Sequence, residues 1–197
     1  MEFLLAGAAA LHTVALLPGA WNPPTLAHLA MSEAALSWAD GAVLVLPRAF
    51  PHKAAEGAPL QQRAEWLVRV AQSRPGLSVA WSDGGLFVEM AREARQATGA
   101  GRVLLVCGTD AAERIVGWDY GAGDCIDRQL EEYELLVAPR QSAYEPPAHL
   151  APRIHTLRLG DGWHDVSSSE VRARIAAHME WESLVPSELH ESVRTAY

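Results

Sequence analysis

The sequence predicts an α/β protein with a doubly wound parallel sheet and a small C-terminal helical region. Three observations lead to this prediction. Short runs of almost continuous apolar residues alternate with longer segments of helical character, and Gly, Pro or Asp follows several of the apolar runs. Apolar runs of this kind are typical of strands buried on both faces of a parallel sheet. The chain of 197 residues is also long enough to bury a sizeable core.

The apolar runs and the segments between them define the expected elements. Six strands are expected at Thr13–Leu17, Ala42–Pro47, Leu77–Ala80, Val103–Cys107, Glu134–Val137 and Ile154–Leu159. Five helices are expected between them at Leu26–Ala39, Leu60–Ser73, Phe87–Ala97, Asp110–Val116 and Cys125–Glu131. Two more, Ser168–His178 and Ser187–Ala196, form the C-terminal region. We therefore expect one domain over 1–197, with a Rossmann-like core at 1–165 and a helical part at 166–197.

The N-terminal segment Phe3–Leu11 is apolar, and two interpretations of it are weighed. A signal peptide is disfavoured because residue 2 is Glu and no basic residue precedes the apolar run. The run is also too short to span a bilayer. We expect an apolar helix or lead-in that packs on the domain, and no membrane partner.

Charge and cysteine content narrow the function classes. The chain has 16 Lys and Arg against 24 Asp and Glu, a net charge of −8, which argues against nucleic acid as a partner because backbone phosphates require a basic face. Cys107 and Cys125 do not have metal-ligand spacing, so the sequence predicts a reduced, cytoplasmic protein without a protein-held metal.

Two distant segments are suited to binding phosphate. In the first, the apolar run Val14–Leu17 leads through a Gly- and Pro-rich turn to a helix that begins near Thr25. A helix start after a strand offers backbone N–H groups and a positive dipole end to an anion. His28 lies one turn after Thr25, so we expect the hydroxyl and the imidazole to meet the same anion.

The second segment is Val166–Arg172, VSSSEVR, near the end of the chain. It opens another helix. Its serines, among them Ser168 and Ser169, offer hydroxyls, and Arg172 offers a guanidinium fork that suits phosphate oxygens. In doubly wound sheets, ligands bind beyond the carboxyl ends of the strands, so we expect both segments at that edge.

Together these segments resemble the two signatures of the nucleotidylyltransferase superfamily. Thr25-Leu26-Ala27-His28 resembles its T/HxGH motif, and Val166–Arg172 resembles its ISSTxxR motif. Val106–Trp118 further resembles the GxD…W segment of bacterial nicotinate mononucleotide adenylyltransferases and their nicotinamide relatives. The resemblance implies that Gly108 admits the nucleotide, Asp110 binds ribose hydroxyls and Trp118 stacks on the pyridine ring.

Two further segments extend the resemblance toward the phosphates. Pro51-His52-Lys53, followed by Arg63, resembles a PPHK…R segment in which the Lys contacts phosphate on the acceptor side, which implies this role for Lys53. Leu135–Arg140 resembles the family's segment in which a strand is followed by an arginine. The resemblance implies that Arg140 reaches the phosphates. The alternative for both residues is a solvated surface cation.

The chain also departs from the family pattern. The turn Pro18–Pro23 reads PGAWNP where the family usually has GGTFDP or GGSFNP, and Ala27 stands in place of the motif Gly. Gly84–Val88 reads GGLFV where the family usually has a Ser-Tyr-Thr segment that helps hold the nicotinate ring. Phosphate chemistry is still expected despite these departures, but they leave the identity of the acceptor substrate open.

The resemblance implies an adenylyltransferase of NAD biosynthesis that transfers AMP from ATP to nicotinate or nicotinamide mononucleotide and releases pyrophosphate. His28 and Thr25 would stabilise charge at the α-phosphate, and Arg172 would hold the leaving group with the two serines. The expected ATP site also includes Gly19, Ala20 and Trp21, with Mg²⁺ held mainly by the ATP phosphates. Alternatives are another acceptor, phosphopantetheine-like or CTP-using, and a non-catalytic nucleotide sensor. The sequence leaves open whether the protein forms a homo-oligomer.

Overall fold

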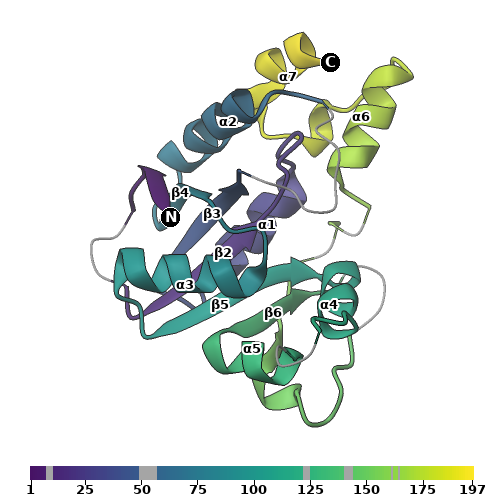
Figure 1. Ribbon diagram of the computed structural model, residues 1–197. Helices are drawn as coiled ribbons and strands as arrows, with labels where there is room; N and C mark the ends of the chain where they lie inside the picture. The colour runs from purple at the N-terminus through teal and green to yellow at the C-terminus, as the bar shows by residue number, and fades with distance from the viewer. Residues whose placement is uncertain (8–10, 49–56, 122–124, 140–143, 161, 164) are drawn as a thin grey trace.

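One sheet organises the molecule (Figure 1). The computed structural model describes residues 1–7, 11–48, 57–121, 125–139, 144–160, 162–163 and 165–197. Its seven strands are β1 (Glu2–Leu5), β2 (Thr13–Pro18), β3 (Gly41–Pro47), β4 (Leu77–Ser82), β5 (Arg102–Gly108), β6 (Glu134–Ala138) and β7 (Ile154–Thr156). They are ordered β1-β4-β3-β2-β5-β6-β7. All pairs are parallel except β1 with β4, so the predicted parallel sheet is confirmed.

The strands wind in both directions from the centre of the sheet. β2 pairs with β3 on one side and with β5 on the other. The chain then runs outward through β3 and β4 in one direction, and through β5, β6 and β7 in the other. A point where the strand order reverses in this way leaves a crevice beyond the carboxyl ends of the two central strands. Here those ends are Pro18 of β2 and Gly108 of β5.

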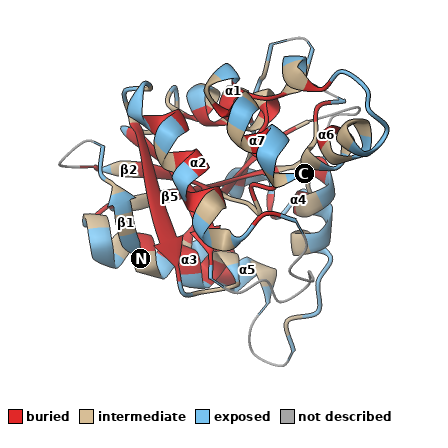
Figure 2. Cartoon of the chain, turned by 90° about the horizontal axis from the view of Figure 1, so that it is seen from above, coloured by how far each residue is buried: buried red, intermediate tan, exposed pale blue. Residues whose placement is uncertain are grey.

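Helices cover both faces of the sheet. They are α1 (Leu26–Ala35), α2 (Leu60–Gln72), α3 (Phe87–Thr98), α4 (Thr109–Val116), α5 (Ile126–Glu132), α6 (Ser168–Ala176) and α7 (His190–Ala196), with short 3-10 helices at Ala151–Arg153, Glu182–Leu184 and Ser187–Leu189. Figure 2 shows the buried strands between α1 and α2 on one side and α3 and α5 on the other. This two-sided cover explains why β3 and β4 contain no exposed residue.

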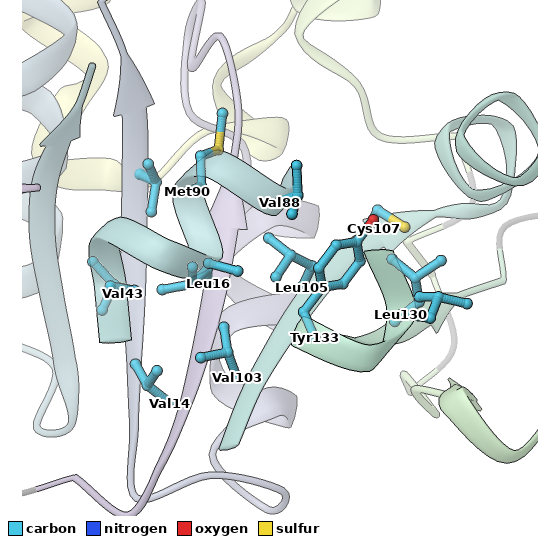
Figure 3. Close-up of a cluster of buried hydrophobic side chains, with 14 of the residues drawn as sticks. Val14, Leu16, Val43, Val88, Met90, Val103, Leu105, Cys107, Leu130 and Tyr133 are labelled. Carbon is cyan, nitrogen blue, oxygen red and sulfur yellow. The ribbon is translucent and has the colours of Figure 1, made fainter. Parts of the chain in front are cut away.

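The core lies on the two faces of the sheet. On the face toward α3, Leu16 and Leu105 of the central strands pack with Val88 and Met90 of the helix, as Figure 3 shows. On the opposite face, the strands pack against a second group of apolar residues that includes Leu67 of α2. Burial of apolar surface on both faces stabilises the sheet and holds the ends of its strands in place.

A third apolar cluster attaches the C-terminal elements to the core. Val171 of α6 and Val193 of α7 are fully buried with Leu29 of α1 and Trp66 of α2. The indole Nε1 of Trp66 donates a hydrogen bond to Oγ of Ser192 at 2.6 Å. α7 accordingly lies beside α2 in Figure 1. This packing confirms the predicted C-terminal helical region and brings it next to the helices that follow β2 and β3.

For the first part of the N-terminal segment Phe3–Leu11 the expected helix was wrong, whereas the expected packing on the domain is confirmed, since Phe3 and Leu5 pack against the core. Glu2–Leu5 forms β1, which pairs antiparallel with β4, and residues 8–10 lie outside the described residues. The strand alternates between exposed and half-buried residues, as an edge strand with one covered face does. By pairing with β4 it satisfies backbone groups that would otherwise be left at the edge of the sheet. No described helix is long and apolar enough to cross a membrane.

Several predicted helix and strand ends differ from the observed ones. α1 ends at Ala35 instead of Ala39, because Leu36, Ser37 and Trp38 donate to the carbonyls three residues earlier and tighten the last turn. The last helix begins at His190 because Ser187–Leu189 forms a separate 3-10 turn. β7 ends at Thr156, where its pairing with β6 stops.

Candidate active site

A cavity of about 860 Å³ opens beyond the carboxyl ends of β2 and β5. Its volume is in the range typical of small-molecule and cofactor sites. The turn after β2, the start of α2, the junction of β5 with α4 and the start of α6 all contribute to its wall. Nine of the residues expected to bind nucleotide line it: Gly19, Ala20, Trp21, His28, Gly108, Asp110, Ser168, Ser169 and Arg172. Segments far apart in the sequence therefore meet at the edge that the topology predicts.

The turn after β2 is held closely against β3. The backbone N–H of Gly19 and the indole Nε1 of Trp21 both donate to the carbonyl oxygen of Val45, at 3.1 Å and 2.8 Å. Trp21 is buried and has a positive φ of 52°. A Cβ on residue 19 would lie 3.0 Å from the indole ring, so the turn needs Gly at this position. The PGAWNP turn, which departs from the family pattern, is thus stabilised by the indole of Trp21 packed at the base of the turn.

The imidazole of His28 has contacts that fix its orientation. Its Nδ1 lies 3.1 Å from the backbone nitrogen of Thr25, which donates to it, and 2.7 Å from Oγ1 of the same residue. The Trp21 ring packs against the imidazole with 5.0 Å between the ring centroids. His28 lines the cavity. Thr25 is fully buried, and its hydroxyl contacts the imidazole instead of the cavity.

Asn22 joins the turn to three other segments. Its carbonyl oxygen accepts from Nη1 of Arg172 at 2.6 Å, and its Oδ1 accepts from the backbone N–H of Ala58 at 3.1 Å. The hydroxyl of Tyr197 donates to the same Oδ1. The next carbonyl along the chain, that of Pro23, accepts from Oγ of Ser168 at 2.7 Å. The start of α6 is therefore attached directly to the turn after β2.

The sequence prediction did not include Asn22 or Tyr197 among the site residues. The position of Asn22 inside the turn beside the first motif is a signal that could have identified it. Tyr197 has no comparable local signal, because its contact with Asn22 exists only after α7 packs against α2.

Three guanidinium groups line the cavity, those of Arg48, Arg63 and Arg172, and Arg48 is paired with Glu2 and Asp83. Arg63 is 5% exposed and donates to the carbonyls of Ala58 and Ala20, at 2.7 Å and 3.1 Å. Burial, with a smaller contribution from the charge of Arg172, lowers the pKa of Arg63, although an arginine remains protonated near neutral pH. Arg172 donates from Nη1 to the carbonyl of Asn22 and from Nη2 to Oγ of Ser169. Two cations close to hydroxyl groups are suited to binding phosphate oxygens.

A smaller cavity of about 220 Å³ adjoins the first, because His28 and Met31 line both. Ala27, Pro139 and Trp163 contribute to its mainly apolar wall. Its small volume and its mainly apolar lining suit a ring that contacts apolar surface and a few polar groups. Ala27 replaces the Gly of the sequence motif, and its methyl group forms part of this wall.

The GGLFV segment, which departs from the family pattern, begins α3 beside the cavity. Phe87 of α3 lines the cavity. Just before it, the backbone N–H of Gly84 donates to Glu93 at 2.7 Å and that of Gly85 donates to Glu89 at 2.8 Å. The backbone donors of Gly84, Gly85 and Leu86 are therefore occupied by glutamates of α3.

Among the expected residues that the structure describes, Thr25 and Trp118 do not line the cavity. Trp118 follows α4, is 48% exposed and is not among the lining residues. Lys53 and Arg140 lie outside the described residues. Their roles stay predictions. Within the described ranges, no group of three or more His, Cys, Asp or Glu side chains is arranged to hold a metal ion.

Most of the chain is similar in sequence to known proteins. Residues 16–174 match the family model described as cytidylyltransferase-like. The chain is 28% identical over 195 residues to the "Probable nicotinate-nucleotide adenylyltransferase" of Stenotrophomonas maltophilia (strain K279a), covering 85% of this chain and 88% of the relative. It is 29% identical over 182 residues to the protein of the same name from Anaeromyxobacter dehalogenans (strain 2CP-C), covering 88% and 89%.

Solved structures share the fold. The Plasmodium falciparum nicotinic acid mononucleotide adenylyltransferase complexed with NaAD superposes with a TM-score of 0.68 at 13% identity, over 93% of each chain. The structure of that enzyme complexed with APC gives 0.66 at 12% identity, over 94% of this chain and 98% of the other. At this level of identity, the likeness concerns the arrangement of the elements.

Proposed function

Because this chain belongs to the cytidylyltransferase-like family of nucleotidyltransferases, we propose that it transfers AMP from ATP to a pyridine mononucleotide and releases pyrophosphate. The observation that carries the proposal is the convergence of His28 with Ser168, Ser169 and Arg172 on one cavity. The two curated relatives, which bear the name nicotinate-nucleotide adenylyltransferase, support nicotinate mononucleotide as the first acceptor to test. The complexes of the Plasmodium enzyme with NaAD and APC support a nucleotide as the ligand.

The two cavities provide for the parts of ATP. In this proposal the adenine ring occupies the smaller cavity, between Ala27 and Trp163, and the triphosphate extends past His28 toward α6. Asp110 binds ribose hydroxyls, since a carboxylate accepts two hydrogen bonds from a diol. The acceptor lies toward Phe87, and Trp118 stacks on its pyridine ring. Lys53 and Arg140 complete the phosphate contacts.

The reaction requires positioning and charge stabilisation more than covalent chemistry by the protein. A phosphate oxygen of the acceptor attacks the α-phosphorus of ATP in line, the bond to the bridging oxygen breaks, and pyrophosphate leaves with its electron pair. The His28 imidazole donates to an oxygen of the α-phosphate. Ser169 and Arg172 donate to the pyrophosphate as its charge develops, Ser168 holds the start of α6 against the turn through its bond to Pro23, and Arg63 adds positive charge.

The divalent metal enters with the substrate in this proposal. The described side chains that line the cavity offer guanidinium, imidazole and hydroxyl groups and the carboxylate of Asp110, which is too few acidic groups for a carboxylate cage. Mg²⁺ commonly keeps most of its ligands as water and phosphate oxygens. Mg·ATP is therefore the form of the nucleotide that we expect to bind. The proposal also retains a single domain over 1–197 and a cytoplasmic location, which two free cysteines favour.

Two alternatives are distinguished by the acceptor and by turnover. The GGLFV segment, with its backbone donors bonded to Glu89 and Glu93, favours an acceptor that differs from that of the family. A phosphopantetheine-like acceptor or CTP in place of ATP keeps the same phosphate chemistry. A non-catalytic sensor keeps the cavity and lacks turnover.

The test is pyrophosphate release from Mg·ATP with nicotinate mononucleotide, nicotinamide mononucleotide and phosphopantetheine offered separately, and with CTP in place of ATP. Turnover with one pyridine mononucleotide supports the proposal and identifies the acceptor. Turnover with phosphopantetheine or CTP alone replaces it with the first alternative. ATP binding in calorimetry without pyrophosphate from any acceptor replaces it with the sensor.

A further inference from the structure

The contact between Thr25 and His28 determines which imidazole nitrogen carries the hydrogen. Thr25 forms the N-cap of α1, three residues before His28. The backbone N–H of Thr25 donates to Nδ1 of His28 at 3.1 Å. Because a backbone N–H has no lone pair to offer, Nδ1 must be the acceptor in this contact.

The hydroxyl of Thr25 strengthens this assignment. Its Oγ1 lies 2.7 Å from Nδ1. Because Nδ1 accepts in the first contact and has no hydrogen to offer, the hydroxyl is the donor in the second. Two donors then point at the single lone pair of Nδ1. A hydrogen on Nδ1 would face the N–H of Thr25, so the neutral imidazole carries its hydrogen on Nε2.

Thr25 and His28 differ in burial, and this difference indicates their different roles. Thr25 is fully buried and is not among the residues that line either cavity, whereas His28 lines both. The ring of Trp21 packs against the imidazole at 5.0 Å and limits its rotation. The indole is itself held by Val45. The hydroxyl is thus placed to act on His28 and not on a ligand.

We propose that Thr25 is a positioning residue that holds His28 in the Nε2–H tautomer, so that the imidazole presents a hydrogen-bond donor to the phosphate. This inference deepens the proposed function and rests on it for the identity of the acceptor atom, a phosphate oxygen. The opposite tautomer would present a lone pair to an anion and repel it. In this chain the T/HxGH-like motif then acts through two side chains. His28 contacts the ligand, and Thr25 contacts and orients His28.

The test combines a tautomer measurement with kinetics. Nitrogen-15 NMR of the imidazole side chains distinguishes a protonated from an unprotonated ring nitrogen, and the His28 signals are assigned by their loss in His28→Ala. In the unmodified protein we expect Nε2 protonated and Nδ1 unprotonated. In Thr25→Val, which keeps the shape and the backbone N–H donor but loses the hydroxyl donor, we expect signals shifted part of the way toward a mixture of tautomers and kcat lower by about tenfold. Thr25→Ser should restore both.

The matched control is Ser32→Ala. Ser32 is also fully buried on α1, and its hydroxyl donates to the carbonyl of His28 at 2.9 Å without contacting the ring. We expect it to leave the imidazole signals and kcat unchanged. A hydrogen on Nδ1 in the unmodified protein overturns the inference, as does Thr25→Val with unchanged nitrogen signals or unchanged kcat. If the protein transfers no nucleotide, the NMR spectra still decide the tautomer. Failure of the proposed function can therefore be distinguished from failure of this inference.

Discussion

The hydroxyl of Tyr197, at the end of α7, donates a hydrogen bond to Oδ1 of Asn22 in the turn after β2, although the two residues are 175 positions apart. The same Asn22 accepts from Ala58 and, through its carbonyl, from Arg172. The Tyr197 ring also packs beside Trp66 of α2. This contact connects the packing of the C-terminal helix to the geometry of the cavity.

Removal of this hydroxyl should affect both stability and activity. Tyr197→Phe keeps the ring and leaves Asn22 with one fewer donor, at a cost of about 1 kcal/mol in the free energy of unfolding. We also expect kcat/KM to fall, because Asn22 helps place Arg172. Urea denaturation and steady-state kinetics measure the two effects. Tyr120→Phe is the control, since its hydroxyl donates to Ile115 away from the cavity wall, and it should keep full activity. Equal activity in both variants would contradict the coupling.

His28→Ala tests the residue expected to contact the α-phosphate. Loss of one transition-state contact of this type costs on the order of 3 kcal/mol, which corresponds to about a hundredfold in kcat. The fold should persist, as checked by circular dichroism. His149→Ala serves as the control because its side chain is 64% exposed and is not among the lining residues. Near-normal turnover, or an unfolded variant, would remove His28 from the mechanism.

Arg172→Ala should weaken binding of the triphosphate and slow turnover, since a guanidinium near the leaving group is lost. We expect kcat/KM for ATP to fall at least tenfold. Arg174→Ala, two residues along the same helix, removes a guanidinium that pairs with Glu170 at 2.7 Å instead. That control should keep its kinetics. If both variants lose activity alike, the effect belongs to the helix and not to the phosphate contact.

Gly57→Ala tests the packing around Asn22. Gly57 has a positive φ of 80°, and a Cβ there would lie 2.4 Å from Nδ2 of Asn22. We expect a loss of more than 1 kcal/mol in stability together with a lower kcat/KM. Gly99→Ala is matched for backbone strain, with a φ of 72°, but its Cβ would meet no atom within 4 Å. It should lose stability and keep full activity, as thermal melts and kinetics can show.

Stability should fall in acid through Glu134. The hydrogen bonds from Arg102, at 3.0 Å and 2.7 Å, hold the pKa of this carboxyl below its ordinary value of 4.5, against the opposing effect of burial. In the unfolded chain the carboxyl binds its proton first as the pH falls, so the stability is complete above about pH 4.5 and is lost as the pH drops through the lowered pKa. The stability advantage over Glu134→Gln, measured in urea, should shrink below that pH. Parallel curves would contradict this.

The sequence by itself determined the sheet, its parallel strands, the helices on both faces and the C-terminal helical region. It also identified the two phosphate-suited segments, and the resemblance to the nucleotidylyltransferase superfamily is confirmed. These features could be predicted because their causes are local. Apolar runs such as those of β3 and β5 indicate strands buried on both faces, and Thr25 and Ser167 stand where helix caps are required.

Tertiary structure alone decided the features that depend on distant partners. Glu2–Leu5 became a strand because the edge of β4 was available, and Thr25 turned to His28 instead of the cavity. The contact of Tyr197 with Asn22 formed only when α7 had packed on α2. In each case the residue type permits several partners, and the free energy of packing and of pairing buried polar groups selects one. That selection depends on where the folded chain brings the partners, which a local pattern does not contain.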